Sequence, residues 1–249
     1  MLNSETVEKL RSMKLGTMAK YFDKQLSDAN ISSLTFEERF GLLVDIEWAT
    51  RQNNRLKRLI RAANYSETDA ALEGIDYVPD RNLDKALIER LSSCDYILKC
   101  RNIILLGATG SGKTYIANAL GMTASRNFIT VKYVRLPELL ADLAIARSEG
   151  TYKKALKTYK SVSLLIIDEW LLTPLKDSEA RDLLEITEGR YHKGSTVFCS
   201  QFEVGGWHEK IGDPTLADAI VDRIVHDAYT IIISGKESMR KKNSFNNAE

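Results

Sequence analysis

Hydrophobic residues in the first sixty positions recur at steps of three and four, the spacing of one face of an amphipathic helix. Between residues 4 and 26 this helical spacing is interrupted near Gly16. A further helix is predicted to open at Thr35-x-x-Glu38, the pattern of a capping box. We therefore predict a small all-helical N-terminal domain over residues 1–65. The helix that follows the capping box carries an apolar stripe at Phe36, Phe40, Leu43, Val44 and Trp48.

The pattern changes after this region. Residues 66–81 have no sustained periodicity and contain Gly74 and Pro79, which predicts a linker. From residue 82 to residue 249, short apolar runs alternate with stretches of helical spacing, and this alternation predicts a parallel sheet with helices on both faces. Five strands are predicted, at residues 103–106, 128–134, 163–168, 195–200 and 229–234.

Two of the predicted helices in this second domain are long. Residues 137–160 are mainly helical in pattern, and a further helix begins at Lys176. We expect the second of these helices to end at Gly194, because glycine is common just after a helix C-terminus. Its inward-facing residues are expected to be Leu183, Leu184 and Tyr191.

Composition narrows the class of protein. The 249 residues contain 44% hydrophobic and 28% charged residues, with no apolar run of the roughly 18 residues that a bilayer span needs. Cys94, Cys100 and Cys199 are widely spaced and form no C-x-x-C pair, which argues against a disulfide framework or a zinc knuckle. These features favour a cytoplasmic protein without a membrane partner.

Overall charge is uninformative about nucleic acid, because the net charge is only +1, but basic residues are clustered. Two interpretations remain open for each cluster: a solvated helix surface, or a surface that contacts DNA phosphates. The first cluster lies at the end of the helix predicted after the capping box, at Arg51, Arg55, Lys57, Arg58 and Arg61. The second lies on one predicted helical face, at Lys153, Lys157 and Lys160.

A phosphate-binding pattern, G-x-x-x-x-G-K-[ST], links the first predicted strand to the next helix. Backbone N–H groups of such a loop point at phosphate oxygens, and the helix N-terminus adds positive potential. Lys113 would reach the β- and γ-phosphates of ATP, and the Thr114 hydroxyl would ligate Mg²⁺. The predicted nucleotide-binding residues are Gly107, Ala108, Thr109, Gly110, Ser111, Gly112, Lys113, Thr114 and Tyr115.

A second motif indicates hydrolysis of the nucleotide. The apolar run LLIIDE ends in Asp168 and Glu169. A carboxylate at this point, here Asp168, can hold Mg²⁺, and the next carboxylate can orient the attacking water. We see no sequence sign of the acceptor pocket that a small-molecule kinase would need. The two motifs together predict an ATPase.

Together these residues resemble the AAA+ ATPases, and within them the clade of replication initiators and helicase loaders. The resemblance implies that Gln201, after the strand STVFCS, is the sensor 1 residue, although that clade usually has asparagine there. It also implies that Arg223 is an arginine finger that completes the site of a neighbouring subunit. An alternative is that Arg223 pairs with Asp218 or Asp222 on its own helix.

Three further residues enter through the same comparison. Arg190 is a second candidate for a contact between subunits. Trp170 either packs in the core or contacts another subunit, and we expect the core position. Arg240 matches the position of a sensor 2 arginine. Only 249 − 233 = 16 residues follow the last predicted strand, so the helical lid of the AAA+ family is expected to be reduced or absent.

The C-terminal stretch WHEKIGDPTLADAIVDRIVHDAY, residues 207–229, closely resembles the IstB family of transposition helper ATPases, as does SGKESMRKK after it. The resemblance implies a protein that binds duplex DNA without strong sequence preference, forms ATP-dependent homo-oligomers on it and stimulates a transposase. Hydrolysis would regulate disassembly. Two alternatives remain. One is a DnaC-type helicase loader, which a transposase gene immediately upstream would argue against. The other is an ATP-gated DNA clamp with negligible turnover.

Overall fold

The computed structural model describes residues 2–28, 31–234 and 239. Contacts divide the chain into two compact units, Met1–Arg58 and Leu59–Glu249, which are described separately below. The sequence placed the end of the first unit at residue 65. The division comes earlier because Ala63 and Tyr65 are buried in the core of the second unit.

The first unit is all-helical, as predicted. The helical conformation is interrupted before Gly16, because Lys14 adopts a left-handed conformation with φ of 61°. The capping box is present, with the Thr35 N–H donating to Glu38 Oε2 at 2.8 Å. Of the predicted apolar stripe only Leu43 is buried, whereas Phe36 and Trp48 are 76% and 64% exposed. The helices are α1 (Leu2–Ser12), α2 (Gly16–Ser27) and most of α3 (Phe36–Ala63).

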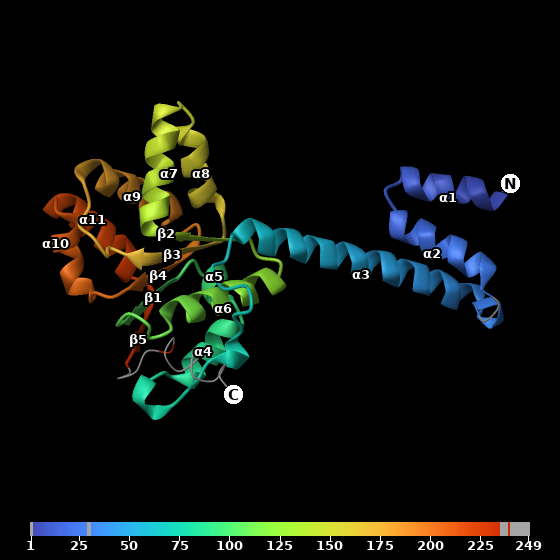
Figure 1. The fold of residues 1–249 in the computed structure, drawn as a ribbon, viewed down its shortest axis with the longest axis horizontal. Coiled ribbons are helices and arrows are strands. Elements are labelled where there is room, and N and C mark those ends of the chain that lie inside the picture. Colours follow the sequence, from blue (N-terminus) through green and yellow to red (C-terminus); the bar gives the residue numbers. More distant parts are fainter. Residues whose placement is uncertain (1, 29–30, 235–238, 240–249) are drawn as a thin grey trace, which may run out of the picture. The chain divides into compact units, whose positions relative to one another are not determined.

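The second unit contains the predicted five-stranded parallel sheet, in the order β2-β3-β4-β1-β5 (Figure 1). Its second strand starts later than the sequence suggested, because Phe128 lies in a turn with φ of 59°. Its third strand continues past Asp168 to Trp170. The strands are β1 (Asn102–Gly107), β2 (Val131–Arg135), β3 (Leu164–Trp170), β4 (Ser195–Ser200) and β5 (Ala228–Ile233).

Successive strand residues face opposite sides of the sheet, and each side has its own hydrophobic core. One core lies under α4 (Lys85–Ser92), α5 (Asp95–Leu98) and α6 (Lys113–Arg126). The other core includes Trp170, whose ring meets those of Phe198 and Trp207 at 4.7 and 5.7 Å between centroids. The core position expected for Trp170 is therefore confirmed. The helices of this second side are α7 (Leu136–Ser148), α8 (Tyr152–Ser161), α9 (Asp177–Arg190), α10 (Trp207–Ile211) and α11 (Pro214–Val225).

The end of α9 differs from the prediction. The helix stops at Arg190, because Tyr191 has an extended ψ of 123° and His192 a left-handed φ of 54°. Gly194 is therefore not the residue that ends the helix. Tyr191 lies beyond the helix and is 38% exposed, so its predicted inward position is wrong.

The predicted linker, residues 66–81, belongs to the second unit and packs against its core. Ala70 and Ile75 are 2% and 6% exposed. The Tyr115 hydroxyl of α6 donates to the Ala71 carbonyl at 3.2 Å, and two short 3-10 turns, Leu72–Gly74 and Pro79–Arg81, shape the segment. We call this segment the strap. Across the described part of the chain, no helix combines the length and apolar character that a bilayer span requires.

Candidate nucleotide-binding site

The loop between β1 and α6 has the backbone that its glycines predict. Gly110 and Gly112 have φ of 78° and 93°, values that residues with a Cβ rarely adopt. Space is also restricted, since a Cβ on Gly112 would lie 2.7 Å from Arg81 Nη2. The loop leads directly into α6, whose 14 residues present an N-terminus to the same place. This geometry suits phosphate binding.

Lys113 lies inside the loop and is 8% exposed. Its Nζ donates to the carbonyl oxygens of Gly107 and Ala108 at 2.7 and 2.8 Å. The ammonium group is therefore held beside the N-terminus of α6, where the phosphates of a nucleotide bind in proteins with this loop.

Arg81 of the strap supports the loop from outside. Its Nη2 donates to the Ser111 carbonyl at 2.8 Å, and its Nη1 donates to the Asp76 carbonyl at 2.6 Å. The guanidinium is buried, and this burial lowers the pKa of Arg81. Sequence reasoning missed Arg81, because the residue stands outside the motif and in a stretch without periodicity.

Asp168 lies near the carboxyl end of β3 and accepts three hydrogen bonds. Its Oδ2 accepts from Thr114 Oγ1 at 2.8 Å and from the Tyr133 hydroxyl at 2.9 Å, and its Oδ1 accepts from the Glu169 N–H at 2.8 Å. Burial is the main cause that raises the pKa of Tyr133, so the phenol is protonated at neutral pH and donates.

The same residues fit a magnesium ion. A hydroxyl and a carboxylate, from Thr114 and Asp168, are the hard oxygen donors that Mg²⁺ prefers. The described residues contain no cluster of three or more histidine, cysteine or acidic side chains that could hold a metal. A site of this kind does not need one, because Mg²⁺ keeps several waters and takes other ligands from substrate phosphates.

Glu169 is displaced from the strand by a backbone irregularity. Its φ is 56°, and the pairing of β3 with β4 shifts register between Ile167 and Trp170. Left-handed conformations of non-glycine residues carry strain and concentrate at functional sites. Both carboxylate oxygens of Glu169 accept from Arg135 Nη2 at 2.7 Å. Arg135 was not found from the sequence, although it pairs with Asp168 in the sheet register.

Gln201 follows β4 and lies beside the loop. Its Oε1 accepts a hydrogen bond from Thr109 Oγ1 at 2.9 Å. The carboxyl ends of β1, β3 and β4 are neighbours in the sheet, which brings the two motifs and Gln201 to one edge. The expected sensor 2 residue, Arg240, lies outside the described residues.

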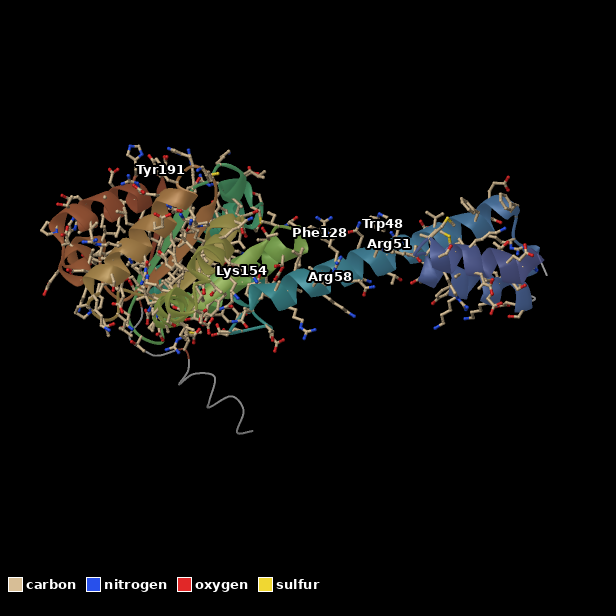
Figure 2. The ribbon with its side chains drawn as sticks, turned by 90° about the horizontal axis from the view of Figure 1, so that it is seen from above. Trp48, Arg51, Arg58, Phe128, Lys154 and Tyr191 are labelled. Atoms are coloured by element: carbon tan, nitrogen blue, oxygen red, sulfur yellow. The ribbon has the colours of Figure 1, made fainter. Side chains whose placement is uncertain are left out.

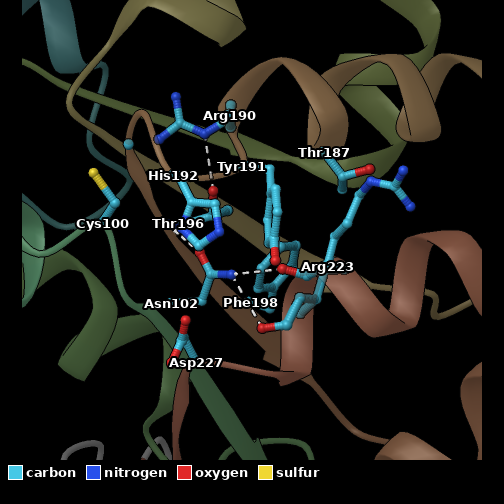
Figure 3. Close-up of a pocket in the computed structure, with 12 residues that line it drawn as sticks. Cys100, Asn102, Thr187, Arg190, Tyr191, His192, Thr196, Phe198, Arg223 and Asp227 are labelled. Atoms are coloured by element: carbon cyan, nitrogen blue, oxygen red, sulfur yellow. Dashed lines mark hydrogen bonds between the residues drawn. The ribbon is translucent and has the colours of Figure 1, made fainter.

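Arg223 lies near the amino end of β1, opposite the strand ends that carry the nucleotide site. Its backbone carbonyl accepts from Asn102 Nδ2 at 3.4 Å, at the start of β1 (Figure 3). The phosphate-binding loop follows the end of this strand, about 16 Å away at 3.3 Å per residue. Arg223 therefore does not belong to the nucleotide site of its own chain.

The guanidinium of Arg223 pairs with neither of the acids that the sequence suggested. It donates to Glu188 Oε1 of α9 at 2.9 Å and to the Ala219 carbonyl at 2.7 Å. Asp218 instead lies 3.0 Å from His208. The alternative of a pair within α11 is therefore wrong as stated, because the acidic partner comes from a neighbouring helix.

Arg190 is a structural residue of this end of the sheet and not a contact between subunits. It is 3% exposed, and burial lowers its pKa to about 10. Its guanidinium donates to Thr196 Oγ1 at 2.9 Å (Figure 3) and to the carbonyls of Tyr159 and Val162 at 2.9 and 2.7 Å. A cavity of about 20 Å³ beside it has room for a water at most.

The basic cluster of α3 is only partly available to a ligand. Arg51 Nε donates to Glu47 Oε1 at 2.7 Å, and its Nη2 donates to the Lys14 carbonyl at 2.6 Å. Glu47 and Arg51 are four residues apart, a signal for this ion pair that the sequence contained. The remaining members are exposed on α3, where Figure 2 labels Arg58: Arg55, Lys57, Arg58 and Arg61.

The second cluster also loses a member. Lys160 forms an ion pair with Glu185 of α9, and its aliphatic chain lies over Gly189. Lys153 and Lys157 are exposed on α8, as is Lys154, which Figure 2 labels. A polyanion could therefore reach two members of the cluster, Lys153 and Lys157, together with the neighbouring Lys154.

The parallel sheet, the glycine loop with Lys113, and Asp168 with Glu169 at the end of β3 define a P-loop ATP-binding protein. The chain belongs to the IstB-like ATP-binding protein family, which matches residues 8–247.

Named relatives agree with this family. The chain is 43% identical over 241 residues to the insertion-sequence ATP-binding protein y4pL of Sinorhizobium fredii, covering 97% of this chain and 98% of that protein. It is 39% identical over 201 residues to the IS1162 ATP-binding protein of Pseudomonas fluorescens, covering 81% and 87%. Among solved structures, the DnaC helicase loader has the same fold, with a TM-score of 0.57, 19% identity, and coverage of 67% of this chain and 97% of that one.

Proposed function

We propose that this protein is an ATPase that forms multimers on duplex DNA without strong sequence preference and stimulates an insertion-sequence transposase. The observation that carries the proposal is Asp168 joined to Thr114 at 2.8 Å, directly beside the phosphate-binding loop and followed by Glu169. Relatives named as insertion-sequence ATP-binding proteins support the link to transposition. Hydrolysis would regulate disassembly of the multimer.

Each residue of the site has a role in this proposal. The loop N–H groups and Lys113 bind the phosphates, and Gln201 senses them through its contact with Thr109. Thr114 and Asp168 would hold Mg²⁺, and the ion would neutralise the negative charge of the phosphates. Glu169 orients and polarises the attacking water. To do so, its carboxylate either accepts hydrogen bonds from Arg135 and the water at once or gives up its bonds to Arg135.

Arg223 is proposed to act on the nucleotide of a neighbouring subunit. Support comes from its position near the amino end of β1 and from its partly exposed side chain, at 29%. An arginine that acts in trans requires head-to-tail contacts, and such contacts generate closed rings or helical filaments. A pairing between the finger and Glu188 would then hold Arg223 until a neighbour binds.

We expect Arg223→Ala to reduce ATP hydrolysis by about 1000-fold, the usual range for an arginine finger. Mixed with Lys113→Ala, whose own Arg223 is intact, the variant should regain part of its phosphate release. The matched control is Arg181→Ala, an exposed arginine of α9, which should hydrolyse ATP at the wild-type rate. Failure to recover activity at every mixing ratio would show that Arg223 does not act in trans.

DNA binding is proposed to come from exposed basic residues on α3 and α8, since phosphate contacts need no base-reading element. We expect reversal of Arg55, Lys57, Arg58 and Arg61 to glutamate to weaken binding to any duplex. The slope of log affinity against log salt should fall by about 0.9 for each phosphate that the protein no longer neutralises. The control is Lys20→Glu, an exposed lysine of α2. The slope is measured by fluorescence anisotropy. An unchanged slope would show that this cluster is a solvated helix surface and does not contact DNA phosphates.

The proposed function is tested by phosphate release measured for the protein alone, with duplex DNA, and with duplex DNA plus its cognate transposase. We expect stimulation by DNA and ATP-dependent stimulation of strand transfer. Zero turnover in all three conditions would favour the DNA clamp. Turnover that responds to a replicative helicase instead of the transposase would favour the helicase loader.

A further inference from the structure

The Asp168 carboxylate is oriented by side chains from two neighbouring elements, α6 and β2. Thr114 and Tyr133 donate to the same oxygen, Oδ2, at 2.8 and 2.9 Å. Thr114 can make this bond and still offer a lone pair to a metal, because a hydroxyl has one donor and two acceptor sites. Tyr133 is buried on β2, at 4% exposure, and stands in neither motif, although its backbone is paired with Ile166 of the LLIIDE strand.

Tyr133 is itself held from outside the sheet. Burial raises the pKa of its phenol, and the Ser66 hydroxyl beside it acts on that pKa in the opposite direction. The Ser66 oxygen in turn accepts from Asn118 Nδ2 at 3.0 Å, and the same nitrogen donates to the Thr114 carbonyl at 2.8 Å. Asn118 is fully buried in α6. Hydrogen bonds therefore connect Ser66 to Asp168 through Asn118 and Thr114, and the Tyr133 phenol lies beside Ser66 while donating to the same carboxylate.

Ser66 is the first residue of the strap and follows shortly after α3, which ends at Ala63. Asn64 turns the chain with a left-handed φ of 58°. Tyr65 then fixes the turn, because its ring is buried and its hydroxyl lies 2.7 Å from Ser125 Oγ of α6. The position of Ser66 is thus determined by how the last turn of α3 meets α6.

We propose that Tyr133 is a positioning residue for the magnesium-binding carboxylate, and that Ser66 holds Tyr133 in place from the end of α3. The proposal rests on the proposed function, since it concerns the same ATP and Mg²⁺ site. Groups that orient a metal ligand commonly alter metal affinity by about 10- to 100-fold when removed.

The test measures metal affinity directly, with Mn²⁺ in place of Mg²⁺ and electron paramagnetic resonance of the full-length protein saturated with a non-hydrolysable ATP analogue. We expect Tyr133→Phe to weaken Mn²⁺ binding by about 10-fold and Ser66→Ala by about threefold. The matched control is Tyr159→Phe. Tyr159 is another buried tyrosine, and its phenol donates to a carboxylate, Asp142, at 2.8 Å. This control should leave Mn²⁺ affinity unchanged.

A double variant tests whether Ser66 acts through Tyr133. If it does, Ser66→Ala should add nothing in the Tyr133→Phe background, whereas additive effects would overturn that part of the proposal. Binding of the analogue in EDTA should stay at the wild-type level in both variants. Intact analogue binding with wild-type Mn²⁺ affinity in Tyr133→Phe would overturn the positioning role alone. A wild-type protein that binds no analogue would overturn the proposed function as well.

Discussion

Lys113→Ala is expected to abolish ATP binding at physiological nucleotide concentrations. The Nζ atom lies inside the loop, 2.7 and 2.8 Å from the Gly107 and Ala108 carbonyls, and is the cation placed to meet the β- and γ-phosphates. Hydrogen bonds to charged groups each contribute about 1.5–3 kcal/mol, so losing them should raise Kd by about 100-fold or more. Isothermal titration with ATP measures this change directly.

Folding must be separated from binding in this experiment, because Lys113 also bonds to its own loop. The matched control is Lys153→Ala, an exposed lysine of α8 that should bind ATP as the wild type does. Circular dichroism and thermal unfolding should show that Lys113→Ala keeps its helices. ATP affinity that stays within about threefold of wild type in folded Lys113→Ala would contradict the assignment of the loop as the nucleotide site.

Glu169→Gln is expected to keep ATP binding while lowering kcat by about 1000-fold, within the range for loss of a residue that activates a nucleophile. The amide has nearly the shape of the carboxylate but lacks the charge that polarises water. If hydrolysis drives disassembly, the variant should also stay on DNA in the presence of ATP. Phosphate release and the rate of dissociation from labelled duplex measure the two effects.

The chain offers a close control for this substitution. Glu138 lies 3.5 Å from Arg135, the same arginine that binds Glu169, so Glu138→Gln removes a neighbouring charge without touching the proposed water-activating group. We expect wild-type hydrolysis in that variant. Equal losses in both variants would indicate that the ion pairs of Arg135, and not the chemistry of Glu169, determine turnover.

Local patterns predicted the repeating elements well. All five strands and the capping box at Thr35 and Glu38 follow from residues that are adjacent or a few positions apart. The phosphate-binding loop is likewise contiguous, so its glycines and Lys113 could be recognised together. Helix ends were less predictable, and α9 stops at Arg190 because His192 takes a left-handed turn that no single residue type requires.

Side chains that come together from distant positions were not predictable. Arg81, Arg135 and Tyr133 each contact the candidate site, yet none stands in a motif. The strap shows the same limit, because buried Ala70 and Ile75 carry no periodic signal in a segment without regular structure. Which basic residues stay available to DNA depends on their acidic partners. Lys160 is paired with Glu185 of α9, and spacing along one helix does not reveal a pair between two helices.

The sequence alone determined the α/β architecture, the loop that fits a nucleotide, and the identity of Asp168 and Glu169, because each depends on spacing along the chain. Only the tertiary structure decided what surrounds them. Parallel strands bring their carboxyl ends to one edge, where Tyr133 and Arg135 of β2 meet the acids of β3. The same topology carries Arg223 to the amino end of β1, away from the loop of its own chain.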